Sequence, residues 1–263
     1  MPRLIPFRLA AACVLALTLT AVGAIAATGA TTKAGKGAIV DLRVVGKGNK
    51  VLTEADVRAG TIAIKTSPQA NCFGPGTGGS GKSVTVKGAT ALGALAQAAK
   101  STSTLRPLLI TDAFDFGLGI CGVGKSKVSG KASWYLKVNH KGAQVSGDAV
   151  KLKAGDEVLW SLAPSYPYPN ELDLEAPERV ETGVPFTVRA FSYDEKGKRK
   201  PVAGAKISGA AAPVVTGADG SAIVTLVATS PQYAILTATH GKEIPSPAAP
   251  VYVCVAGSCP AAK

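Results

Sequence analysis

The sequence has 263 residues, more than one average domain, and a formal net charge of +12. The charge is uneven: residues 27–165 hold 18 Lys and Arg against 8 Asp and Glu, a net +10, whereas residues 166–263 hold 9 of each. In the basic half, 15 lysines and 3 arginines are scattered without an interleaved row of aromatic residues. This pattern argues against a nucleic-acid interface and favours solvated lysines or an anionic envelope partner.

Residues 1–27 are predicted to form a secretory signal peptide. Two arginines precede an uncharged run rich in Ala, Leu and Val, and the run ends in small residues at Ala24 and Ala26. The strongly apolar part is marginal for a membrane span, which needs about 20 residues. We therefore expect export, cleavage near Ala26 or Ala27, a spacer over residues 28–37 and no transmembrane segment after cleavage.

Four cysteines remain after the signal sequence, namely Cys72, Cys121, Cys254 and Cys259. An even number in an exported chain indicates disulfides, although three pairings are formally possible. The short spacing favours Cys254 with Cys259, which leaves Cys72 with Cys121. A metal site is disfavoured because the chain has only 2 histidines, neither at metal-ligand spacing. We expect no metal and no cofactor.

The first domain is expected over residues 38–163, mostly as strands. A helix is predicted at 90–100, where Thr90 is a suitable N-cap and Leu92, Leu95 and Ala99 recur at helical spacing. The predicted strands are 38–46, 60–65, 83–87, 108–114, 133–139, 148–152 and 157–162.

A second domain is expected over residues 171–255. Residues 164–170, PSYPYPN, hold three prolines and are predicted to form an extended linker. Short alternating segments then follow at the rhythm of a β-sandwich, and residues 256–263 form a C-terminal tail. The fold class is therefore mainly β, with one helix in the first domain.

Residues 76–83, GTGGSGKS, match the phosphate-binding loop pattern of nucleotide-hydrolysing enzymes. That loop works between a buried strand and the N-terminus of a helix. Here a polar, proline-containing segment precedes the motif, and the strand-like Ser83-Val-Thr-Val follows it. We interpret it as an exposed glycine-rich loop beside Cys72.

No catalytic constellation is evident. His140 and His240 lie in different predicted domains, and Asp112 and Asp115 are interpreted as turn and capping residues. We expect a protein that is not an enzyme, with an unrecognised hydrolase kept as an alternative.

Both tryptophans lie in residues 133–162. Alternation places Trp134 on the same strand face as Leu136, and we expect Trp134 and Trp160 in the core. The opposite face and the following turn then offer a candidate ligand-binding surface, to which the linker adds two tyrosines held between prolines. The candidate ligand-binding residues are Tyr135, Asn139, His140, Tyr166 and Tyr168.

Residues 38–163 resemble the transcobalamin-like C-terminal domain family, a bacterial family of unknown function (number 4430). The resemblance lies in an early V-x-L-R-V strand, TALGALAQA, a W-x-x-x-V-N motif and a G-D-x-V-x-W motif. His140 stands where that family usually has glycine. The matching residues are Trp134, Val138, Asn139, Gly155, Asp156, Val158 and Trp160. The resemblance implies a β-grasp-like α+β domain with one helix on a sheet.

Residues 171–255 resemble bacterial immunoglobulin-like domains, which act as spacers or adhesive modules. The combined resemblances imply an exported, non-enzymatic binding or adhesion protein of the cell envelope, whose partner is an envelope polymer, a carbohydrate or a small molecule. The alternative is a carrier for a corrinoid-like small molecule, which would need a partner to complete the pocket. No nucleic-acid partner is expected, and the oligomeric state is left open.

Overall fold

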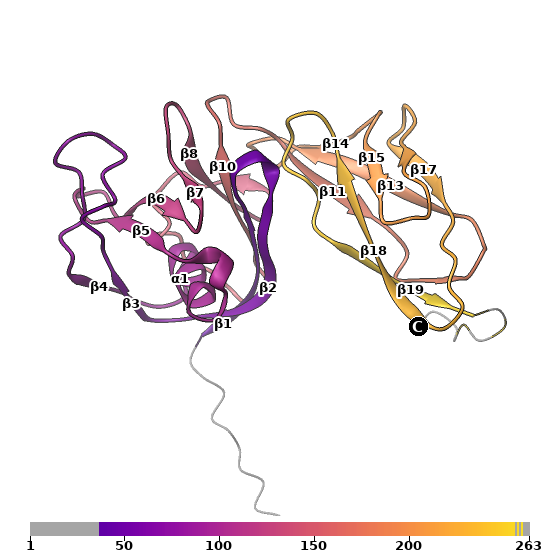
Figure 1. Ribbon diagram of the computed structural model, residues 1–263, viewed down its shortest axis with the longest axis horizontal. Coiled ribbons are helices and arrows are strands. Elements are labelled where there is room, and N and C mark those ends of the chain that lie inside the picture. Colours follow the sequence, from indigo (N-terminus) through magenta and orange to yellow (C-terminus); the bar gives the residue numbers. More distant parts are fainter. Residues whose placement is uncertain (1–36, 256, 258, 260–263) are drawn as a thin grey trace, which may run out of the picture. The chain divides into compact units, whose positions relative to one another are not determined.

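The computed structural model describes residues 37–255, 257 and 259 (Figure 1). The predicted signal peptide, nearly all of the predicted spacer and most of the predicted tail lie outside these residues. Strands and a single α-helix make up the regular structure, which confirms the predicted mainly-β fold. The described residues belong to one compact unit.

A five-stranded mixed sheet forms the centre of the first half. Its strand order is β2-β1-β10-β8-β9, and β1 and β10 pair in parallel at the middle while every other neighbouring pair is antiparallel. This is the order and direction of a β-grasp sheet. The strands are β1 (Ala38–Val45), β2 (Val51–Ala59), β8 (Ser133–Val138), β9 (Lys141–Gly142) and β10 (Glu157–Ala163).

Helix α1 (Ala91–Ser101) packs against this sheet, as Figure 1 shows. The Thr90 side chain accepts a hydrogen bond from the backbone N–H of Gly93 at 3.0 Å, which satisfies one of the free donors at the helix start. Leu92 and Leu95 are fully buried in the same core as Trp160. The predicted helix and its N-cap are therefore confirmed.

Two smaller sheets complete the first half. One pairs β3 with β4, and the other has the order β5-β6-β7. Their bounds, with those of two short 3-10 helices, are β3 (Ile62–Lys65), β4 (Ser83–Val86), β5 (Leu108–Thr111), β6 (Gly119–Val123), β7 (Ser126–Lys127), η1 (Lys47–Asn49) and η2 (Ser103–Leu105).

In the first half, strands β2, β6, β7 and β9 lie outside the predicted strands, and the strand predicted at 148–152 does not form. A turn covers residues 147–149, where the backbone N–H groups of Ala149 and Val150 both donate to the carbonyl of Ser146, and Lys151 forms only an isolated bridge with Thr90. Strand β2 was not predicted because its charged residues lie on its exposed positions and interrupt the apolar pattern. Strand β6 was not predicted because glycines occupy two of its five positions.

The second half contains two sheets that share one apolar core. The first joins β11 to β13, which also pairs with β14 and β17, and the second has the order β12-β19-β18-β15-β16. Val188 from the first sheet and Leu236 from the second lie in this common core, as expected of a β-sandwich. The bounds are β11 (Glu171–Glu175), β12 (Arg179–Glu181), β13 (Phe186–Tyr193), β14 (Arg199–Pro201), β15 (Lys206–Ser208), β16 (Val214–Val215), β17 (Ser221–Val224), β18 (Gln232–Thr239) and β19 (Ala249–Cys254).

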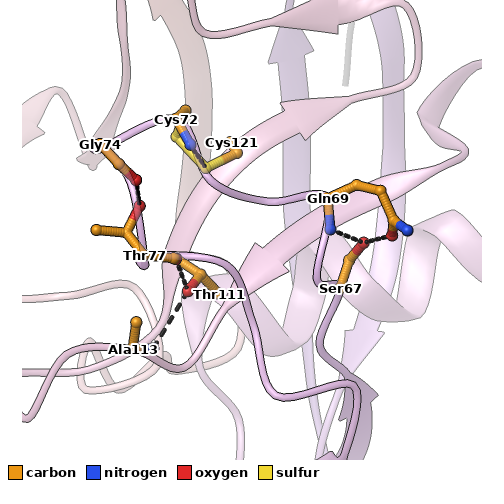
Figure 2. Close-up of a disulfide and its surroundings, with 8 residues drawn as sticks. All are labelled: Ser67, Gln69, Cys72, Gly74, Thr77, Thr111, Ala113 and Cys121. Atoms are coloured by element: carbon orange, nitrogen blue, oxygen red, sulfur yellow. Dashed lines mark hydrogen bonds between the residues drawn. A yellow bond between two sulfur atoms is a disulfide. The ribbon is translucent and has the colours of Figure 1, made fainter.

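Both predicted disulfides are present. Cys72 joins Cys121 across a sequence separation of 49, and Cys254 joins Cys259 across a separation of 5. The first ties the glycine-rich loop to β6, and Figure 2 shows the Thr111 hydroxyl donating to the carbonyl of Thr77 in the same loop.

The glycine-rich motif is held as a loop and lacks the strand-to-helix setting of a phosphate-binding site. The Asp112 carboxylate accepts hydrogen bonds from the backbone N–H and the hydroxyl of Ser80, each at 2.6 Å. Ser83 then begins β4, which pairs antiparallel with β3. Asp112 therefore holds a loop 32 residues away in the sequence, and does not have the local turn or capping role that the sequence predicts.

We expect the two disulfides to contribute unequally to stability. Replacing Cys72 and Cys121 together with serine should lower the free energy of unfolding by about 4 kcal/mol, and replacing Cys254 and Cys259 together by about 2 kcal/mol, because the longer loop restricts the unfolded chain more. Urea unfolding of both double variants measures the difference. Equal losses would contradict the loop-length explanation.

Candidate functional site

The first half contains an aromatic cleft of about 680 Å³ beside β8. Three stretches of the sequence, within residues 116–120, 133–136 and 143–147, form most of it, together with four single residues. The lining residues are Phe73, Phe116, Leu118, Gly119, Ile120, Ser133, Trp134, Tyr135, Leu136, Ala143, Gln144, Val145, Ser146, Gly147, Trp160, Tyr168 and Glu195.

Phenylalanines that the sequence analysis did not select form one side of the aromatic cleft. Phe114 meets Phe73 edge to face, with ring centroids 5.2 Å apart, and stacks on Phe116 at 4.9 Å. Phe116 is 75% exposed and Phe73 is 48% exposed. Phe73 follows Cys72 directly, so the disulfide fixes the position of this ring. Large apolar surface is thus left open to solvent in a defined arrangement.

Tyrosines of the linker form another part of the wall. Tyr168 stacks on Tyr135 with ring centroids 4.0 Å apart, and Tyr166 meets the edge of Tyr168 at 5.6 Å. Tyr135 and Tyr168 line the cleft, whereas Tyr166 is an exposed neighbour of Tyr168. The structure thus brings three of the predicted ligand-binding residues together.

Three side-chain polar atoms of the cleft residues are buried without a hydrogen-bond partner in the described part of the protein. They are Nε1 of Trp134, the hydroxyl of Tyr135 and Oγ of Ser146. Buried polar groups are usually paired, and each unpaired one costs about 1–3 kcal/mol. Burial raises the pKa of Tyr135, and the nearby Glu195 carboxylate raises it further, so its hydroxyl stays protonated and able to donate.

The charge of the aromatic cleft differs from that of the chain. Among the described residues that line it, Glu195 is the only charged one, although the chain has a net charge of +12. An anionic ligand would meet a carboxylate and no cation here. The cleft therefore suits a neutral or cationic ligand with a flat or ring-shaped face.

Asn139 and His140 lie outside this cleft. Both have left-handed backbone conformations, with φ of 49° and 67°, in the turn after β8. The Asn139 side chain donates to Asp156 Oδ1 and accepts from the backbone N–H of Glu157, each at 2.9 Å. Asn139 thus closes a turn, and His140 belongs to a separate group of charged residues.

The expectation of an exposed face opposite the tryptophans is wrong. Tyr135 is 6% exposed and Lys137 is 1% exposed, because residues from the second half of the chain cover this face. The Lys137 ammonium donates to the carbonyl of Tyr193 at 3.0 Å. Trp160 is in the core as predicted, with Nε1 donating to the carbonyl of Ala91 at 3.2 Å, but Trp134 is only partly buried and lines the cleft.

Glu171, which is only 4% exposed, has three basic side chains as partners under that covered face. Its Oε1 lies 2.5 Å from Nη2 of Arg43, and its Oε2 lies 3.5 Å from Nζ of Lys137 and 3.3 Å from Nδ1 of His140. We call these four residues the Glu171 cluster. They line a charged cavity of about 220 Å³ whose described lining contains no Ser, Thr or Cys that could act as a nucleophile.

The electrostatics of the Glu171 cluster favour the charged forms of Glu171 and His140, whereas burial lowers the pKa of Lys137 against the effect of Glu171. Burial acts to raise the pKa of Glu171, but contacts with His140, Arg43 and Lys137 outweigh it and hold the pKa below its ordinary value. The contact with Glu171 raises the pKa of His140 against the effect of burial. This arrangement neutralises a buried carboxylate, and we interpret it as an anchor between strands.

The described residues contain neither a metal-binding group nor a membrane-spanning helix. No group of three or more His, Cys, Asp or Glu side chains there could hold a metal ion. No helix in the same residues is long and apolar enough to cross a membrane. The two disulfides are compatible with a protein outside the reducing cytosol.

Comparison of the chain with protein-family models, curated proteins and solved structures found no match. The two family resemblances therefore remain predictions.

Replacing Glu171 with Gln should lower the free energy of unfolding by about 3–5 kcal/mol, because Arg43 and Lys137 are left buried without a countercharge. A matched control lies on the same strand: Glu175 forms an exposed ion pair with Arg199, so Glu175→Gln should cost less than about 1 kcal/mol. Urea unfolding compares the two variants. Equal effects would show that the Glu171 cluster is not a stabilising anchor.

Stability should fall on both sides of a pH window set by the Glu171 cluster. The pKa of Glu171 is lowered from 4.5, so its contribution is present above that value and is lost as pH falls through the folded pKa. The pKa of His140 is raised from 6.5, so its contribution is complete below that value and is lost as pH rises through the folded pKa. Urea midpoints measured from pH 3 to pH 9 report both the loss of stability at acid pH and the loss at alkaline pH. In His140→Asn, which suits the left-handed backbone, the alkaline decline should weaken.

Proposed function

We propose that this chain is an exported, non-enzymatic binding protein of the cell envelope that holds a neutral carbohydrate in its aromatic cleft. The observation that carries the proposal is the exposed, fixed pair of Phe116 and Phe73 over a cavity of about 680 Å³. Under this proposal the β-grasp-like part supplies the site, and the immunoglobulin-like part is a spacer or adhesive module.

The chemistry of the cleft supports a carbohydrate ligand. The faces of sugar rings pack on aromatic side chains, which give large contact area for little loss of conformational entropy. Sugar hydroxyls both donate and accept hydrogen bonds, and the cleft residues include the unpaired groups of Trp134, Tyr135 and Ser146. These three atoms are screened from solvent, so side chains must shift before a ligand can reach them. Each bond then made would remove the cost of an unpaired buried group.

Export is supported by the predicted signal peptide together with the two disulfides. In an envelope, repeated carbohydrate polymers present many copies of one ring-shaped unit, so a protein that leaves one unit can rebind a neighbouring one. A binding role of this kind needs no nucleophile and no metal.

A carrier of a small molecule is the second candidate function. The volume of the aromatic cleft lies within the range of about 300–1,000 Å³ that is usual for small-molecule sites. Because Phe116 stands largely exposed at the cleft, a partner protein that covered this ring would enclose the ligand. A flat corrinoid-like molecule is the kind of ligand that such a carrier would hold.

Phe116→Ala should weaken binding of neutral hexose or N-acetylhexosamine oligosaccharides by about tenfold, because one stacking ring contributes roughly 1.4 kcal/mol. Isothermal titration calorimetry of the protein without its signal sequence measures the affinities. The matched control is Tyr233→Ala, which removes an exposed ring on β18 far along the chain. Binding that is equal in both variants would remove the cleft from consideration. Binding of flat small molecules alone would favour the carrier.

A further inference from the structure

A further cavity, of about 440 Å³, has a lining that differs in chemistry from the aromatic cleft and shares no residue with it. Its charged lining residues are three lysines, and the described residues that line it include no carboxylate. We call it the lysine pocket. It is lined by Lys47, Gly48, Asn49, Lys127, Ser129, Ala132, Leu162, Pro164, Gly241 and Lys242.

Hydrogen bonds fix the segments that carry these lysines. The backbone N–H of Lys47 donates to Oγ of Ser126 at 3.0 Å, which joins η1 to the strand that carries Lys127. The Asn49 side chain donates to the carbonyl of Glu243 at 2.8 Å, which holds the turn that carries Lys242 against η1. Three cationic side chains therefore start from positions that the fold sets, although they come from distant parts of the chain.

The charge of the lysine pocket is not compensated within the described residues. None of Lys47, Lys127 and Lys242 forms an ion pair with a carboxylate there. The acidic residue next to Lys242 is engaged elsewhere, because Glu243 accepts from the Ser192 hydroxyl at 2.5 Å and pairs with Nδ1 of His240 at 2.8 Å. The three exposed lysines line one hollow, and an anion bound there would offset the repulsion between their charges.

We propose that the lysine pocket binds phosphate groups, as a monoester or a diester. Lysine ammonium groups are compact, strongly hydrated charges that bind phosphate as point charges and can approach it from several directions. The Ser129 hydroxyl in the lining can donate a further hydrogen bond. This proposal goes beyond the proposed function, because the aromatic cleft carries no cation and suits a neutral ring.

The test compares two triple variants with equal loss of charge. The pocket variant combines Lys47→Gln, Lys127→Gln and Lys242→Gln, which removes all three cationic side chains from the lining of the lysine pocket. The control replaces Lys82, Lys87 and Lys206 with Gln, three exposed lysines that do not line the pocket. Inorganic phosphate is titrated into isotopically labelled protein at fixed ionic strength, and amide shifts report both binding and its location. Urea midpoints confirm that both variants are folded.

We expect phosphate to shift the amides of residues 47–49, 127–129 and 241–242, and the pocket variant to lose at least about tenfold in affinity while the control changes little. Equal weakening in both variants would overturn the proposal in favour of diffuse lysine electrostatics. Absence of phosphate-dependent shifts in the unmodified protein would also overturn it.

Two further arms separate the sources of the phosphate group. Vesicles of phosphatidylglycerol and of phosphatidylcholine test a lipid headgroup, and soluble polyphosphate tests a phosphate polymer. If the unmodified protein binds one of these materials and the pocket variant does not, that material identifies the source of the phosphate group. Because oligosaccharide binding in the aromatic cleft should be unchanged in the pocket variant, failure of one proposal leaves the other standing.

Discussion

The burial of the Glu171 carboxylate is the constraint on which the arrangement of the described chain depends. Removing a charge from water is expensive unless partners surround it, and the partners come from strands on both sides of β10. Arg43 on β1 and Lys137 on β8 are both register neighbours of Leu159 on β10. Glu171 is the first residue of β11. It can therefore reach both Arg43 and Lys137 only if β11 begins over β10, the strand between β1 and β8. Leu159 itself packs with Val45 and Ile244 in a small apolar cluster that joins the two halves of the chain.

This anchor also positions part of the aromatic cleft. Tyr168 precedes Glu171 by three residues, and Tyr135 lies two positions from Lys137 on β8. When Glu171 is held over Lys137, the linker can run alongside the neighbouring stretch of the same strand, where Tyr168 stacks on Tyr135. A buried salt bridge is weak evidence for stability by itself. Here its geometric effect matters more, because it places one wall of the cleft.

The sequence predicts what is encoded locally and misses what depends on distant partners. Thr90 and the apolar spacing after it identify helix α1, and the spacing of four cysteines identifies both disulfides, because each rests on a nearby pattern. The position of Lys137 is predicted wrongly, because a lysine at an alternating strand position normally marks a solvent face. Its burial is compensated by two partners from beyond the linker, the Glu171 carboxylate and the carbonyl of Tyr193. The cleft is missed for a related reason. Phe73 and Phe116 lie in polar, glycine-containing loops, and nothing local indicates that a disulfide and ring contacts will hold them beside Trp134.

The parallel pairing of β1 with β10 has a consequence for the order in which the chain can fold. Nearly the whole first half separates these two central strands, so their pairing must close a long loop, and contacts between distant residues slow folding. Cys72 and Cys121 both lie within that loop. If their bond forms first, it removes the residues between them from the effective length of the loop and lowers the entropy lost when β10 arrives. A chain whose Cys72–Cys121 bond forms before β10 docks would then lose less entropy when β1 and β10 pair. A reduced chain would have to close the full loop to form the same sheet.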